Sequence, residues 1–228
     1  AGAAAIAEYL QQLGISHLYL SPVMTAQPGS IHGYDVTDPT TVSAALGGPG
    51  GLKALSDEVR TRGMGLIIDL VPNHVGVGNP QHNRWWWDVL RNGRRSKYAH
   101  YFDIDWSPGN GAGGRLALPV LQSENDPAAL TVDRTGPEPM LALHDMRFPI
   151  APGTDGDNAL RIHDKQHYRL VSWKSGVCGY RRYLAVNTLA ALRQEETEVF
   201  DITHRELMAW CDHDLIDGVR VDHPDGLT

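Results

Sequence analysis

The chain has 228 residues, of which 42% are hydrophobic and 21% are charged. These values are typical of a soluble globular protein with a sizeable core. Its 20 basic and 27 acidic residues give a net charge of −7, which argues against nucleic acid or an anionic membrane surface as the main partner. Two cysteines without metal-site spacing argue against a disulfide framework, so we expect a reducing, cytoplasmic location. No apolar run approaches the roughly 18 residues that a membrane helix needs.

The first residues, "AGAAAIAEYLQQLG", predict an amphipathic helix with Ile6, Tyr9, Leu10 and Leu13 on one face. No leader pattern precedes this helix, and the last residues follow directly on a predicted strand. We therefore expect the chain to be a piece of a larger protein.

Strand-like and helix-like segments alternate over the first 72 residues. Residues 15–23 are a short apolar run, residues 47–63 have helical periodicity, and residues 64–72 are a continuous apolar run with one acid. Such a run is typical of a strand buried on both faces of a parallel sheet. The polar, glycine-rich stretch 24–40 predicts a loop. This order predicts an α/β fold.

A second helix and strand are predicted at residues 197–215 and 216–222, near the end of the chain. The long stretch before them is rich in Gly, Pro, Trp and His, and a connection of that length must have structure of its own. We therefore assign residues 1–74 and 186–228 to the α/β part and residues 75–185 to an inserted subdomain.

Polar side chains follow each of the three predicted strands. They are Ser21; Asp69, Asn73 and His74; and Arg220 and Asp222. The carboxyl ends of parallel strands meet at one edge of the fold, where active sites form. A single aspartate there more often caps a helix or fixes a loop. Three strands that end in this way favour a shared polar site.

Arg220 and Asp222 are two residues apart, so on a strand both side chains project from the same face. An arginine keeps a neighbouring carboxylate ionised, which suits a nucleophile or an electrostatic stabiliser better than a proton donor. The alternative is an ion pair that only holds two strands in register. The pair alone does not separate these interpretations.

The eleven histidines lack paired spacing on a helix or a compact ligand set, which argues against a catalytic transition metal. A calcium ion held by Asn73 and loop oxygens stays open. The run "RWWWDVL" (84–90) places three tryptophans in sequence, which cannot share one face of a regular element. Aromatic faces pack against sugar rings, so the run favours a carbohydrate ligand, with a subdomain core as the alternative.

Two segments carry a family resemblance. "DLVPNH" (69–74) and "DGVRVDH" (217–223) resemble the first two signature segments of the α-amylase superfamily, glycoside hydrolase family 13. Within it, "LGISHLYLSPVMTAQPGSIHGYDVTDPTTVSAALGG", "GYRRYLAVNTLAALR" and "VRVDHPDGL" resemble the maltooligosyl trehalose synthase family. The resemblance runs over nearly the whole chain. It implies part of a (β/α)₈ TIM barrel, about strands two to four, with a subdomain inserted after the third barrel strand.

The resemblance also implies roles for individual residues. Asp222 matches the nucleophile and Arg220 its charge partner. The positions that match the sugar site are Tyr34, Asp35, Asp69, His74 and, near an acceptor subsite, His223. Asn73 matches a calcium position of many amylases, but this subfamily is not expected to need the ion, and we expect no metal and no cofactor.

The general acid/base of the family is a glutamate at the end of the next barrel strand, and this sequence ends before it. Glu195, Glu196 and Glu198 are simply the acids at the start of the last helix. Retaining chemistry needs two carboxyl groups about 5 Å apart. We therefore expect this segment alone to be inactive and the remainder of its own catalytic chain to be its partner.

The implied activity is that of an isomerase that acts on maltooligosaccharides. It converts the reducing-end α-1,4 linkage to α,α-1,1 by intramolecular transglucosylation with a retaining double displacement. One alternative is an α-glucan hydrolase or another transglycosylase of the superfamily. The other is a non-catalytic glucan-binding barrel, against which the presence of both Arg220 and Asp222 argues.

Overall fold

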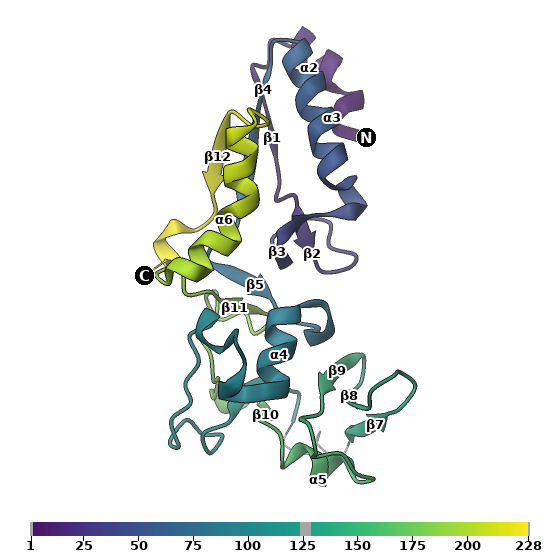
Figure 1. Ribbon diagram of the computed structural model, residues 1–228, viewed down its shortest axis with the longest axis vertical. Helices are drawn as coiled ribbons and strands as arrows, with labels where there is room; N and C mark the ends of the chain where they lie inside the picture. The colour runs from purple at the N-terminus through teal and green to yellow at the C-terminus, as the bar shows by residue number, and fades with distance from the viewer. Residues whose placement is uncertain (1, 124–128, 228) are drawn as a thin grey trace. The chain divides into compact units, whose positions relative to one another are not determined.

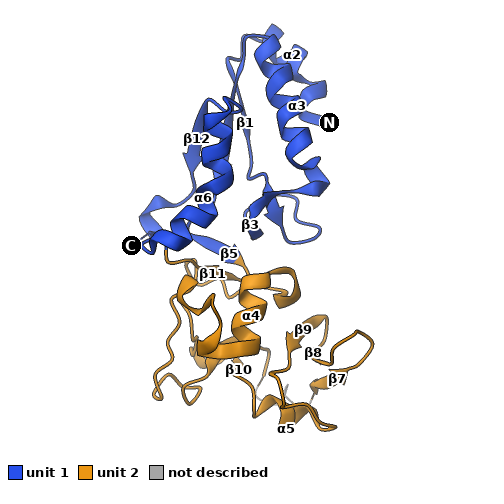
Figure 2. Cartoon of the chain, viewed as in Figure 1, with its two compact units in different colours: residues 1–75, 194–228 blue, residues 76–193 orange. Residues whose placement is uncertain are grey.

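The computed structural model describes residues 2–123 and 129–227 (Figure 1). The chain divides into two compact units (Figure 2). Unit 1 comprises residues 1–75 and 194–228, and unit 2 comprises residues 76–193. None of the helices in the described ranges is long and apolar enough to cross a membrane.

Unit 1 contains both helices and strands. They are α1 (Gly2–Ala5), α2 (Ala7–Gln12), β1 (His17–Leu20), β2 (Met24–Ala26), β3 (Val36–Val42), α3 (Gly48–Thr61), β4 (Gly65–Leu70), α6 (Thr197–Asp212) and β12 (Gly218–Val221); β5 (His74–Gly76) lies at the boundary. Three of the strands form a parallel sheet in the order β1-β4-β12. Its register places Tyr19 beside Ile67 and Arg220 beside Asp69. The predicted parallel α/β arrangement is confirmed.

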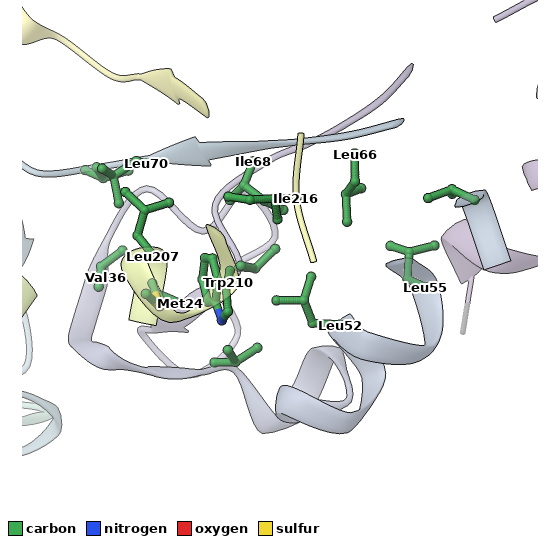
Figure 3. Packing of buried hydrophobic residues seen from close by; sticks show 14 of the residues in the cluster. Met24, Val36, Leu52, Leu55, Leu66, Ile68, Leu70, Leu207, Trp210 and Ile216 are labelled. Carbon is green, nitrogen blue, oxygen red and sulfur yellow. The ribbon is translucent and has the colours of Figure 1, made fainter. Parts of the chain in front are cut away.

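The hydrophobic core of unit 1 covers one face of this sheet (Figure 3). Leu66, Ile68 and Leu70 alternate along β4 and are buried against apolar side chains of α3 and α6, including Leu52 and Trp210. Burying each large apolar side chain stabilises the fold by about 1.5–3 kcal/mol. Because side chains alternate along a strand, Asp69 projects from the opposite face.

Helix α3 has the predicted bounds to within two residues. Pro49 lies in its first turn, where its missing N–H costs no hydrogen bond. Gly63 follows the helix in the left-handed region with a φ of 70°. The apolar residues between Pro49 and Gly63 therefore form one face of the helix, and this face packs against the core.

The predicted face of the first helix is confirmed only for Leu10, which is partly buried against the core. The helix is interrupted at Ile6, and the side chains of Ile6, Tyr9 and Leu13 are exposed. The fully buried residue of this segment is Ala7. Small alanines form a second stripe that overlaps the apolar one, and periodicity does not decide which of two overlapping stripes packs closely.

The predicted loop at residues 24–40 is confirmed for residues 27–35 and wrong at its two ends. Strands β2 and β3 form these ends and pair antiparallel, with Met24 beside Val42 and Ala26 beside Val36. The register shifts twice, so β3 contains extra residues that accommodate Pro39, which has no N–H to donate. The β-branched residues of 36–42 favour a strand. Their signal was outweighed by the glycines and prolines before them.

The described residues of unit 2 form two small sheets and short helices. Its helices and strands are α4 (Arg84–Asn92), β6 (Leu116–Leu121), β7 (Thr131–Asp133), β8 (Met140–Leu143), β9 (Met146–Pro149), α5 (Ala159–His163), β10 (Tyr168–Ser172) and β11 (Leu189–Ala191). Strands β6 and β10 pair in parallel, and β7-β8-β9 form an antiparallel sheet.

The tryptophan run lies on α4, and two of its three members are core residues. Asn83 caps the helix by accepting the N–H groups of Trp85 and Trp86 at 3.1 and 3.0 Å. Both indoles are buried, and that of Trp86 packs edge-on against Phe102 at 4.9 Å between ring centroids. Trp87 is half-buried. The core interpretation therefore holds for the first two.

Candidate active site

A polar cluster lies at the carboxyl ends of β4 and β12. Asp69 is on β4, and Arg220 lies beside it on β12. Nη1 of Arg220 donates to both carboxylate oxygens of Asp69 at 3.0 Å and to Oδ1 of Asp222 at 2.5 Å. The N–H of Asp222 donates to the carbonyl of Leu70 at 2.8 Å, which continues the strand pairing and fixes the Asp222 backbone.

Two tyrosines complete the cluster. The hydroxyl groups of Tyr19, on β1, and of Tyr34, in the loop before β3, both donate to Oδ2 of Asp69, the latter at 2.6 Å. These hydrogen bonds to a carboxylate are the main cause that raises the pKa of each phenol, and burial adds to the effect. Both tyrosines are therefore neutral donors over the physiological range.

The carboxylates of the cluster are buried, whereas their cation is not. The side chain of Asp69 is 0% exposed and that of Asp222 is 8% exposed, whereas that of Arg220 is 48% exposed. Hydrogen bonds to Asp69 and then to Asp222 raise the pKa of Arg220. Two buried negative charges on one cation need further donors, and the two tyrosines supply them.

The second oxygen of Asp222 accepts no hydrogen bond from residues 2–123 or 129–227. The first oxygen accepts from Arg220, whose guanidinium is always charged. An ionised carboxylate with one oxygen fixed and one without a hydrogen bond is suited to nucleophilic attack.

His74 lies behind Tyr34 and is buried. Its Nε2 donates to the carbonyl of Tyr34 at 3.2 Å, and Nδ2 of Asn73 donates to its Nδ1 at 3.5 Å. One ring nitrogen therefore donates while the other accepts, which is the neutral tautomer. Burial lowers the pKa of His74 and so favours the same neutral form. His74 thus fixes the backbone that positions the Tyr34 ring.

Asp35 and His223 are the sequence neighbours of Tyr34 and Asp222. The carboxylate of Asp35 accepts from the hydroxyl of Ser30 and lies 3.8 Å from Nδ1 of His32, so it fixes its own loop. His223 has a left-handed backbone with a φ of 46°, and its partly exposed ring lies 3.5 Å from the carboxylate of Asp225. The structure therefore brings Tyr34, Asp69, Arg220 and Asp222 together.

Ser21, predicted at the end of the first strand, lies outside the cluster, and Tyr19, which was not predicted, lies in it. Ser21 is exposed, and in the described ranges it makes no hydrogen bond to the cluster. Tyr19 was passed over as part of an apolar run. Its signal was the alternation of His17, Tyr19 and Ser21 with Leu18 and Leu20, which places the polar residues on one face.

The calcium alternative rests on Asn73. Its Oδ1 is buried and has no hydrogen-bond partner among the described residues. Calcium takes six to eight oxygen ligands, and the described residues contain no group of three or more His, Cys, Asp or Glu side chains placed for a metal. One orphaned amide oxygen is not by itself a calcium site, and no metal enters the mechanism below.

Comparisons with known proteins place this geometry in a family. Residues 2–227 match the model of the alpha-amylase catalytic domain. A putative maltooligosyl trehalose synthase of Mycobacterium tuberculosis (strain CDC 1551 / Oshkosh) is 56% identical over 221 residues, which are 97% of this chain and 28% of that protein. The intracellular maltogenic amylase of Bacillus subtilis (strain 168) is 32% identical over 126 residues, which are 55% of this chain and 18% of the amylase.

The structure of maltooligosyltrehalose synthase from Arthrobacter ramosus superimposes with a TM-score of 0.93 at 54% identity, covering 99% of this chain and 29% of that one. The chain thus spans under a third of the length of these relatives. Its parallel strands and helices are part of a barrel. The chain belongs to the alpha-amylase family, as part of its catalytic domain.

Proposed function

We propose that this chain is part of a maltooligosyl trehalose synthase, an isomerase that converts the reducing-end α-1,4 linkage of a maltooligosaccharide to α,α-1,1. The observation that carries the proposal is the extent of the similarity. The mycobacterial synthase is 56% identical in sequence over 97% of this chain, whereas the maltogenic amylase is 32% identical over 55% of it. The cluster around Asp69, Arg220 and Asp222 supplies one of the two carboxylates that the reaction needs.

Asp222 is proposed as the nucleophile. Its carboxylate attacks the anomeric carbon of the penultimate glucose, and the α-1,4 bond to the terminal glucose breaks. A general acid protonates the departing oxygen, and a β-glycosyl enzyme remains. We expect this acid in the remainder of the catalytic chain.

The second half of the reaction reverses these roles. The released glucose stays bound and turns, and its anomeric hydroxyl gives its proton to the same general base as its oxygen attacks the glycosyl enzyme. The bond to Asp222 breaks, and two inversions give net retention. Because water would give hydrolysis at this step, the pocket must exclude water and hold free glucose.

The other site residues have supporting roles in this proposal. Tyr34 stacks under the reacting glucose, with His74 fixing its backbone. Asp69 acts through Arg220 and the tyrosines, since its side chain is wholly buried. Asp35 fixes the loop that carries Tyr34, and His223 faces an acceptor subsite. We also propose that β1, β4 and β12 are barrel strands two to four and that unit 2 is the subdomain inserted after the third.

The test is an incubation of the complete protein with maltopentaose. We expect a non-reducing isomer to accumulate while reducing ends disappear at the same rate. Reducing sugar as the main product would instead support the hydrolase alternative, which the similarity to the maltogenic amylase keeps open. Glucan binding without any product would support a non-catalytic barrel. The 228-residue chain by itself is expected to show no turnover.

A further inference from the structure

Tyr19 occupies a position in the cluster that the roles above leave unexplained. It lies on β1, next to β4, on the sheet face that carries Asp69 and Arg220. Its hydroxyl donates to Oδ2 of Asp69, the same oxygen that accepts from Tyr34. The two tyrosines come from different segments, so Asp69 joins β1 and the Tyr34 loop to β12.

The number of donors around Asp69 explains why a second hydroxyl matters. A single nitrogen of Arg220 is shared among three oxygens, two of Asp69 and one of Asp222. Asp69 is wholly buried, so protein groups must replace the hydrogen bonds that water would supply. Asp69 and Asp222 compete for the guanidinium of Arg220. Each tyrosine hydroxyl that donates to Asp69 satisfies part of that carboxylate and so leaves more of the guanidinium for Asp222.

We propose that Tyr19 is a positioning residue for the nucleophile: by donating to Asp69 it keeps Arg220 shared with Asp222. The proposal rests on the assignment of Asp222 as nucleophile made above. Tyr19 acts through Asp69 and Arg220 and does not touch the reacting atoms. Without its hydroxyl, Oδ2 of Asp69 has one donor fewer, and Arg220 moves toward Asp69 and away from Asp222.

The first test is Tyr19→Phe in the complete protein, with Tyr9→Phe as the matched control. Tyr9 lies exposed on α2 and belongs to no part of the cluster. A lost hydrogen bond to a charged group predicts that kcat falls about 10- to 100-fold in Tyr19→Phe. KM is expected to stay within about twofold, because the glucan contacts do not change. The control keeps both constants.

The division of the effect between kcat and KM separates positioning from a general loosening of the site. A nucleophile that is displaced while the glucan contacts stay intact lowers kcat and leaves KM nearly unchanged. A loosened site weakens substrate binding as well, so KM rises while kcat falls. An unchanged kcat in Tyr19→Phe, or a loss that lies mainly in KM, would overturn the proposal.

A double-mutant cycle tests the route through Asp69. In an Asp69→Asn background, Tyr19→Phe is expected to add less than about twofold to the loss of kcat, because the hydroxyl then has no carboxylate to hold. Independent, multiplicative losses would show that Tyr19 acts by another route. The single-variant kinetics and the double-mutant cycle both measure rates, so they test the role of Tyr19 whether the product is the isomer or reducing sugar. The identity of the product tests the proposed function separately.

A measurement without any Tyr19 substitution covers the case in which Tyr19→Phe does not fold. The ring carbon that bears the Tyr19 hydroxyl is followed by NMR during an alkaline titration of the labelled protein. Its hydrogen bond to Asp69 raises the pKa of Tyr19, so it is expected to stay protonated after exposed tyrosines have ionised. Asp69→Asn is expected to remove the difference. A Tyr19 that ionises together with the exposed tyrosines contradicts the proposal, whatever the activity.

Discussion

Each unit contains an arginine paired with an aspartate at a strand end, and the two pairs differ in their balance of charge. In unit 2, Nε of Arg147 on β9 donates to Asp133 on β7 at 2.7 Å. In unit 1, Arg220 on β12 is shared between Asp222 and Asp69. Spacing in the sequence does not distinguish a structural pair from a reactive one.

The surrounding donors do distinguish them. Asp133 also accepts the N–H and the hydroxyl of Thr135 at 2.9 and 2.6 Å, and Arg147 donates to the carbonyl of His144 at 2.8 Å. One cation therefore faces one fully bonded anion, which is a stable and inert arrangement. Arg220 faces two buried anions, and the carboxylate at the strand end keeps one oxygen without a hydrogen bond in the described residues. An excess of negative charge is useful where a nucleophile is needed.

The largest expected effect is a loss of activity on substitution of the aspartate in the unit 1 pair but not in the unit 2 pair. Asp222→Asn removes the proposed nucleophile, and kcat of the complete protein is expected to fall by about 10⁴-fold or more. Asp133→Asn is the matched control and is expected to leave kcat within about twofold. Kinetics with maltopentaose measure both. Intact activity in the Asp222 variant would remove its role, and a large loss in the Asp133 variant would undo the distinction between the pairs.

The second prediction concerns the stability that the aromatic core of unit 2 provides. Trp86→Ala removes a buried indole that packs against Phe102 and Tyr180, and it is expected to lower the free energy of unfolding by about 3–5 kcal/mol. Trp173→Ala is the control, because that indole is 51% exposed, and its expected loss is below about 1 kcal/mol. Urea unfolding followed by fluorescence measures both. Equal losses would show that the aromatic cluster is not the core of unit 2.

The smallest effect is a pH dependence of unit 2. His163 is buried and accepts the N–H of Leu170 at 3.1 Å. Burial, with Arg115 as a lesser cause, lowers its pKa to about 4. The unfolded chain thus takes up the proton first, so stability is full above about pH 6.5 and is lost as the pH falls toward 4, by at most about 3 kcal/mol.

His163→Gln is expected to flatten this part of the unfolding profile between pH 7 and pH 4.5. Activity per folded molecule is expected to stay unchanged, because His163 belongs to unit 2 and not to the cluster. An equally steep profile in the variant would assign the pH dependence to another group.

The sequence predicted the parallel part of unit 1 well because its signals are local. Residues 47–63 and 64–72 carry apolar periodicity with a proline or a glycine at the boundaries, and they correspond to α3 and β4. The β2–β3 pair was missed because antiparallel pairing joins residues whose glycines and prolines locally favour a loop. The face of the first helix was confirmed only for Leu10 because its small and large apolar stripes overlap.

Most residues of the candidate site could be predicted from the sequence, but the hydrogen bonds between them could not. The segment resemblance selected Tyr34, Asp69, Arg220 and Asp222, which the fold brings together, and their roles stay proposals. The burial of Asp69 and the donation from Tyr19 depend on the register between β1, β4 and β12. The register is fixed by packing between strands, so the sequence of a single strand does not determine it.

The Asp69 carboxylate has a consequence for the order in which the protein forms during synthesis. Its tyrosine donors lie 50 and 35 residues before it, whereas its cation lies 151 residues after it. Burying that carboxylate before Arg220 exists would leave a charge without a partner in an apolar setting. All of unit 2 is translated in that interval. The polar edge of the sheet is therefore expected to close late, after the intervening unit has emerged from the ribosome, although Tyr19 and Tyr34 are made before that unit.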